Sequence, residues 1–174
     1  MHCLQKKSYC LNNDFNYIDV KGKNALTLAC DKKYDEISEY LFKCQKIINL
    51  PGLFANCVSI KSIKIPTYFT EIADHSFFGC ESLTEVFLPP TIVSIGNYSF
   101  YKCIKLTTIE MLYTVASIGD YSFYRCESLV NINIPSSVVS IGNYAFYGCK
   151  SLVNINIPSS VVSIGDYAFY GCES

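Results

Sequence analysis

Six cysteines recur every 23 residues along the C-terminal two thirds of the chain. They are Cys57, Cys80, Cys103, Cys126, Cys149 and Cys172. In five copies the fifteenth residue after the cysteine is Ile and the twentieth is Phe. Residues 128–150 and 151–173 differ only at Asn143/Asp166 and Lys150/Glu173. A fixed period of this length is typical of arrays in which each copy stacks on its neighbours.

Each copy contains the pattern of one short strand and one turn. In residues 128–135, SLVNINIP, apolar residues alternate as in a strand with one buried face, and Pro ends the strand because it cannot donate to a ladder. The glycine that follows SSVVSI is expected to form a turn with positive φ, and the next Asn or Asp to cap a short helical turn. These positions are Gly96, Gly119, Gly142 and Gly165, followed by Asn97, Asp120, Asn143 and Asp166.

One copy is too short to bury a core of its own, so neighbouring copies are expected to pair their strands into a short parallel sheet. The pattern C-x-S-L-x-x-I-x-I-P-x-x-V-x-x-I-G-x-Y-A-F-Y-G covers about residues 53–174. It resembles the 23-residue, treponemal-type leucine-rich repeat of BspA-like surface proteins. The resemblance implies an α/β repeat solenoid coiled in the right-handed sense. It also implies a surface antigen that adheres to host or matrix proteins.

The third copy departs from this pattern. Leu112 stands where the other copies have Pro, and Tyr113-Thr114 replaces a small polar pair. We expect a looser strand exit there.

The 23-residue period ends upstream of Leu53, so we divide the chain into residues 1–48 and 49–174, with about five copies and the last one incomplete. Residues 14–43 have a helical pattern and resemble a single ankyrin repeat, with Asn-Ala-Leu-Thr at 24–27 in place of the usual Thr-Pro-Leu-His. One such repeat has too little core to be stable alone. An ankyrin-like helical hairpin that caps the solenoid is therefore expected, and a remnant of a longer ankyrin array is the alternative.

The periodic cysteines have three possible interpretations: disulfides, buried thiols or a zinc site. Stacked copies would bring equivalent Cα atoms to roughly 5 Å, within disulfide range. Cysteine is also a small apolar residue that fits a crowded interior, and a zinc site would favour paired ligands such as C-x-x-C, which the sequence lacks. We predict reduced, buried thiols, no metal and no cofactor. The predicted structural ladder comprises the six cysteines with Phe77, Phe100, Phe123, Phe146 and Phe169.

The candidate binding residues lie five and seven positions after each cysteine, where strand side chains should point outward on the concave face. They are Ser62, Lys64, Glu85, Phe87, Thr108, Glu110, Asn131, Asn133, Asn154 and Asn156. An exposed Phe87 resembles part of a contact patch, but ordinary solvated surface is the interpretation that we favour for these residues. The Asn pairs favour hydrogen-bonded ladders. Two tyrosine rows, beginning at Tyr98 and Tyr101, fit either packing or an interface.

The charge balance and the lack of known motifs limit the classes of function that the sequence favours. The chain has 14 Lys and Arg against 15 Asp and Glu, so no basic excess favours nucleic acid. It has no apolar run long enough for a transmembrane segment, no signal-like start and no catalytic motif. We therefore predict a non-enzymatic interaction module with a protein partner. Surface adhesin, intracellular leucine-rich/ankyrin scaffold and truncated family member all stay open, as does end-to-end self-association through the uncapped C-terminal coil.

Overall fold

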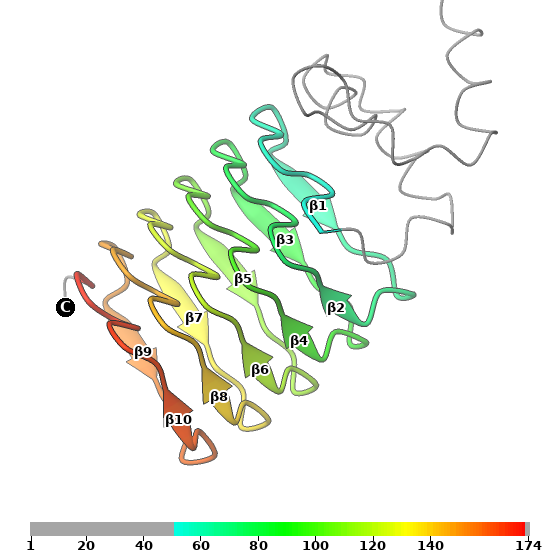
Figure 1. Cartoon of the computed structure of the whole chain (residues 1–174). Coiled ribbons are helices and arrows are strands. Elements are labelled where there is room, and N and C mark those ends of the chain that lie inside the picture. Colours follow the sequence, from blue (N-terminus) through cyan, green and yellow to red (C-terminus); the bar gives the residue numbers. More distant parts are fainter. Residues whose placement is uncertain (1–50, 173–174) are drawn as a thin grey trace, which may run out of the picture. The chain divides into compact units, whose positions relative to one another are not determined.

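The computed structural model describes residues 51–172, which belong to one compact unit spanning 49–174. These residues form a solenoid of five coils, and each coil contributes one strand to each of two parallel sheets (Figure 1). We number the coils by their residues: coil 1 is 57–79, coil 2 is 80–102, coil 3 is 103–125, coil 4 is 126–148 and coil 5 is 149–171. The predicted ankyrin-like hairpin lies outside the described residues.

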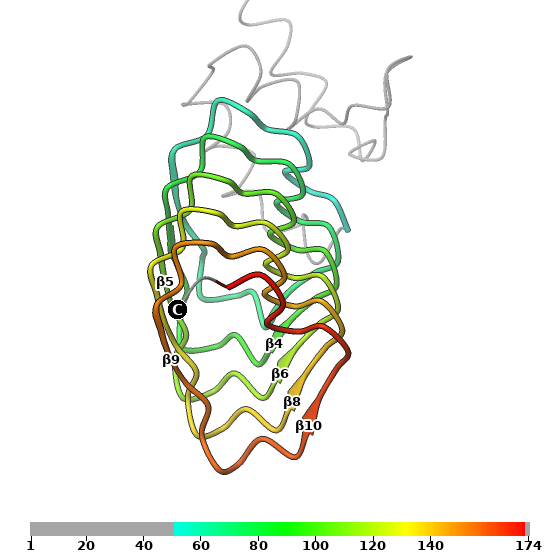
Figure 2. The same ribbon diagram turned by 90° about the vertical axis from the view of Figure 1, so that its left-hand side faces the viewer.

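The two sheets lie on opposite flanks of the coil (Figure 2). The first sheet comprises β1 (Ser62–Lys64), β3 (Glu85–Phe87), β5 (Thr108–Glu110), β7 (Asn131–Asn133) and β9 (Asn154–Asn156). The second sheet comprises β2 (Glu71–Ile72), β4 (Ser94–Ile95), β6 (Ser117–Ile118), β8 (Ser140–Ile141) and β10 (Ser163–Ile164). The first sheet is the parallel sheet that the sequence predicts. The second sheet is not expected from the sequence.

The register is the same throughout: each strand residue pairs with the residue 23 positions later, as Ile132 pairs with Ile155. The pairing of β3 with β5 joins two residue pairs, whereas the other first-sheet pairings join three. This shortening falls in the copy that has Leu112 in place of Pro. The strand exit nevertheless keeps its hydrogen bond, because Thr114 Oγ1 donates to the Ile92 carbonyl at 2.8 Å.

The prediction of positive φ at Gly96, Gly119, Gly142 and Gly165 is wrong, since none of the four is among the residues with positive φ. Glycine is needed there for another reason. A Cβ on Gly96 would lie 2.7 Å from both the backbone N of Asp74 and the carbonyl O of Ile72. The backbones of successive coils approach each other too closely for a side chain at this position.

The predicted helical turns are also wrong, and residues 51–172 contain no helix, which leaves an all-β solenoid in place of an α/β one. The second residue of each turn lies in the left-handed region, as Tyr98 does at φ 55° and Tyr121 at φ 54°, and this conformation cannot continue a right-handed helix. Within the same residues no helix could span a membrane.

The Asn and Asp residues before these turns do not act as helix caps. The backbone N–H of Asn97 donates to Asp74 Oδ1 at 2.7 Å, and that of Asp120 donates to Asn97 Oδ1 at 2.8 Å. The same bond recurs in the following coils. These side chains therefore tie one coil to the next.

A column of phenylalanine rings runs through the interior. Successive rings from Phe54 to Phe169 stack with centroids 5.0–5.3 Å apart and nearly parallel planes. Phe77, Phe100, Phe123 and Phe146 are fully buried. Rows of Leu and Ile, including Leu106 and Ile118, complete the core.

Candidate interaction surfaces

The first sheet exposes one face to solvent. In β3, β5 and β7 the central residue is buried and the two flanking residues are exposed. The structure thus places nine of the candidate residues on this exposed face: Ser62, Lys64, Glu85, Phe87, Thr108, Glu110, Asn131, Asn133 and Asn156. Asn154 pairs in register with Asn131.

The face changes in character along the array. In coils 1 to 3 it carries Lys64, Glu85, Phe87 and Glu110, and Phe87 leaves 52% of its surface exposed in β3. Phe87 pairs with Lys64 in the register of β1 and β3. In coils 4 and 5 the face carries Asn, and no side-chain hydrogen bond joins Asn133 to Asn156 within the described part of the chain. The N-terminal half therefore presents an apolar group among charges.

The thiols form an interior row. Cys57, Cys80, Cys103, Cys126 and Cys149 are buried, Cys172 is half-buried, and none of the six forms a disulfide within residues 51–172. Five of them donate to the carbonyl of the phenylalanine 26 residues earlier, as Cys103 Sγ does to Phe77 O at 3.1 Å. Burial, with a smaller contribution from the neighbouring thiol, raises the pKa of Cys103 and of Cys126 well above the usual value. These thiols are poor nucleophiles, because the thiolate is the reactive form.

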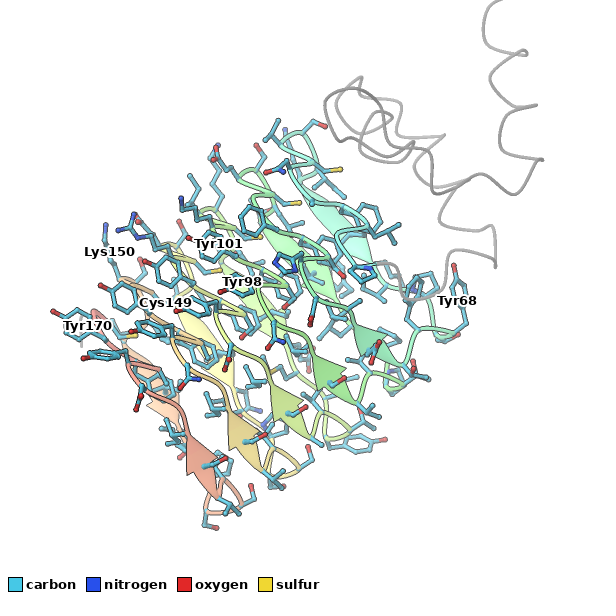
Figure 3. The ribbon with its side chains drawn as sticks, viewed as in Figure 1. Tyr68, Tyr98, Tyr101, Cys149, Lys150 and Tyr170 are labelled. Atoms are coloured by element: carbon cyan, nitrogen blue, oxygen red, sulfur yellow. The ribbon has the colours of Figure 1, made fainter. Side chains whose placement is uncertain are left out.

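Two aromatic rows follow the turns. The inner row is His75, Tyr98, Tyr121, Tyr144 and Tyr167, and the outer row is Phe78, Tyr101, Tyr124, Tyr147 and Tyr170. Successive rings stack at 4.7–5.2 Å with planes within 18° of parallel. Ring faces therefore cover one another, and ring edges with their hydroxyls meet the solvent (Figure 3). Burial, then neighbouring Tyr98, raises the pKa of Tyr121, which keeps its hydroxyl a donor.

Two cationic side chains, Lys102 and Arg125, lie beside the outer row and were not predicted as functional residues. Lys102 Nζ lies 5.5 Å from the centroid of the Tyr101 ring, and Arg125 Cζ lies 5.8 Å from that of Tyr124. A signal was present in the sequence, because the equivalent position is Gly in coils 1, 4 and 5.

A shallow groove of about 390 Å³ lies over β2 and β4. Its polar lining includes Glu71, Asp74, Ser94 and Asn97. Asp74 is engaged by the backbone of the next coil. No three His, Cys, Asp or Glu side chains in residues 51–172 are grouped so that they could hold a metal ion. The groove offers hydrogen-bonding groups rather than an arranged acid–base pair.

The repeat, the two parallel sheets and the buried Phe and Cys columns can be compared with known proteins. The sequence model of the BspA type leucine rich repeat region matches residues 50–174, with six copies. The chain belongs to this family. No curated protein is significantly similar to the chain.

Two solved structures have a similar fold. The leucine rich repeat protein of T. pallidum (TpLRR) is 36% identical, with a TM-score of 0.63 over 64% of this chain and 54% of that one. The pneumococcal vaccine antigen PcpA is 23% identical, with a TM-score of 0.56 over 67% of this chain and 29% of that one. The chain thus spans about half the length of the first relative and less than a third of the second.

Proposed function

We propose that the chain is a non-enzymatic protein-binding module that uses the exposed face of the first sheet. The observation that carries the proposal is Phe87, exposed over 52% of its surface among Lys64, Glu85 and Glu110. Large apolar side chains within a polar rim are typical of contact sites. Membership of a family of leucine-rich repeats supports the same function.

The matched test uses the array's own residues. The variant E85N/F87N/T108N/E110N gives coils 2 and 3 the asparagine pairs of coils 4 and 5, and N131T/N133E gives coil 4 the residues of coil 3. Wild-type protein immobilised through its N-terminus should capture a partner from host or native extracts. The first variant should lose that partner while the second retains it. Equal capture by all three would refute this face as the binding site.

The adhesive, cell-surface form of this function is supported by the family resemblance and by the fold shared with a vaccine antigen. Protease treatment of intact cells tests it, because a displayed chain is degraded and an internal one survives. The alternative, an intracellular scaffold, is supported by the lack of a disulfide among the six cysteines of residues 51–172. A family member without separate activity would show no specific capture in the test above.

End-to-end self-association is a further part of the proposal. In coil 5, Val162 is 88% exposed and Ile164 49% exposed, and β9 and β10 each have one described neighbour. Two such ends could bury these side chains against each other. Sedimentation should then give a concentration-dependent dimer that V162K abolishes, and a monomer at all concentrations would contradict the idea.

We propose that residues 1–48 form an ankyrin-like helical hairpin that caps the leucine-rich unit. Deleting them should lower the melting temperature of the leucine-rich unit. An unchanged melting temperature would contradict a capping role.

A further inference from the structure

Each coil has two turn positions with the left-handed backbone conformation, and the second of them is glycine in some coils and a cation in others. Gly79, Gly148 and Gly171 hold it in coils 1, 4 and 5, with φ of 69°, 69° and 72°. Coils 2 and 3 instead place Lys102 at φ 57° and Arg125 at φ 54°. Glycine adopts this conformation freely, whereas residues with a Cβ are strained in it. The two cations thus occupy a position for which the array already has an unstrained residue, and such local strain points to function.

The surroundings of the two cations are those of an anion site. Both side chains are exposed, and neither forms an ion pair with an acidic residue of 51–172. Lys150, by contrast, pairs with Glu127 at 3.1 Å. The two neighbouring rings, Tyr101 and Tyr124, stack at 4.8 Å, so the cations lie one coil apart along a row of phenol hydroxyls. Cations and hydroxyl donors together form a positive, hydrogen-bonding strip.

We propose that this strip, made of Lys102 and Arg125 with the hydroxyls of Tyr101 and Tyr124, docks an acidic segment of a protein partner. Carboxylates accept charge-assisted hydrogen bonds from Lys, Arg and Tyr together. Tyr and Arg are also among the residues enriched at protein interfaces. A carbohydrate ligand would need exposed faces of the tyrosine rings to pack against. Stacking covers these faces along the row. The strip is separate from the first-sheet face and does not depend on the function proposed for that face.

The test measures binding of a fluorescein-labelled decaglutamate peptide to the full chain by fluorescence anisotropy at low salt. The variant K102G/R125G removes both cations and adopts the glycine of the other coils. The control K61T/K105S removes two exposed cations that belong neither to the strip nor to the first-sheet face, using residues that other coils carry at those positions. We expect the first variant to bind roughly 10-fold or more weakly, equivalent to about 1.4 kcal/mol. The control should stay within about 2-fold of wild type.

The hydroxyls are tested by Y101F/Y124F, which copies Phe78 of coil 1 and keeps the stack. Affinity should fall a few-fold, and raised salt should weaken binding of the wild type further.

Three outcomes would overturn the proposal. Equal losses in K102G/R125G and K61T/K105S would show that the peptide binds only through the overall charge of the chain. A lower melting temperature of K102G/R125G would make the cations structural, whereas we expect it unchanged or raised. Tighter binding of heparin than of decaglutamate, lost in K102G/R125G, would assign the strip to sulfated glycans instead of an acidic protein segment.

Discussion

The array contains two kinds of aromatic column with the same 23-residue period and nearly the same spacing. The phenylalanine column stacks at 5.0–5.3 Å inside the coils, and the tyrosine rows stack at 4.7–5.2 Å over the turns. They differ in burial: Phe123 is fully buried, whereas Tyr121 and Tyr124 are half-buried. Since area removed from water provides most of the stabilisation, the inner column should hold the fold. The two tyrosine rows remain accessible for recognition.

The largest expected effect is in the inner column. Phe123→Ala should lower the free energy of unfolding by about 3–5 kcal/mol, because it leaves a cavity between two stacked coils. Phe169→Ala in coil 5 should cost less, since Phe169 is only half-buried. Denaturant unfolding of both variants measures the difference. A near-wild-type curve for Phe123→Ala would contradict the role assigned to this column.

The thiols provide a second test of the interior. Cys103, Cys126 and Cys149, whose pKa values are raised first by burial, should resist alkylation in the native state, while half-buried Cys172 reacts first. A raised folded pKa favours the neutral thiol. The contribution of these thiols to the free energy of unfolding is therefore fully present below the ordinary thiol pKa of about 8.5. It is lost as the pH rises above that value, because the thiols of the unfolded chain ionise before those of the folded chain. Rapid native labelling of Cys103, or stability that is flat up to high pH, would refute the burial.

Substitutions in the two tyrosine rows should change the free energy of unfolding less than those in the phenylalanine column, and glycine should be tolerated better than alanine. Tyr144→Ala should cost about 1–2 kcal/mol, because it removes two stacking contacts. Tyr144→Gly should cost less than Tyr144→Ala, since residue 144 has a φ of 54° that glycine adopts without strain. The denaturation midpoints of the two variants decide the order. If Ala is the more stable, backbone strain does not contribute at this position.

Sequence reasoning located the first sheet, because alternating residues around Ile109 and Ile132 fix which side chains point inward. For the same reason it placed Phe87 on the exposed face. It missed the second sheet, since two residues such as Ser94–Ile95 are too short to show an alternating pattern.

It also misassigned the role of Gly96, because the close approach that requires glycine comes from Asp74, one coil away. The left-handed tyrosines and cations were missed because residues with a Cβ rarely adopt that conformation.

The smallest expected change in stability comes from the position nineteen residues after each cysteine, which is serine in three coils and alanine in two. Ser99 and Ser122 are fully buried, and their hydroxyls have no hydrogen-bond partner among residues 51–172. Ser76 occupies the same position in coil 1, but its hydroxyl donates to the Ala73 carbonyl at 2.7 Å. Coils 4 and 5 have Ala145 and Ala168 there.

Ser99→Ala should therefore stabilise the fold by up to about 1 kcal/mol, because it removes a buried hydroxyl that makes no bond. Ser76→Ala should destabilise it by roughly 0.5–1.5 kcal/mol, because it removes a bond that is made. Thermal unfolding of the two single variants gives the comparison. Two shifts of the same sign would mean that burial alone, and not the hydrogen bond, sets the preference between serine and alanine along this row.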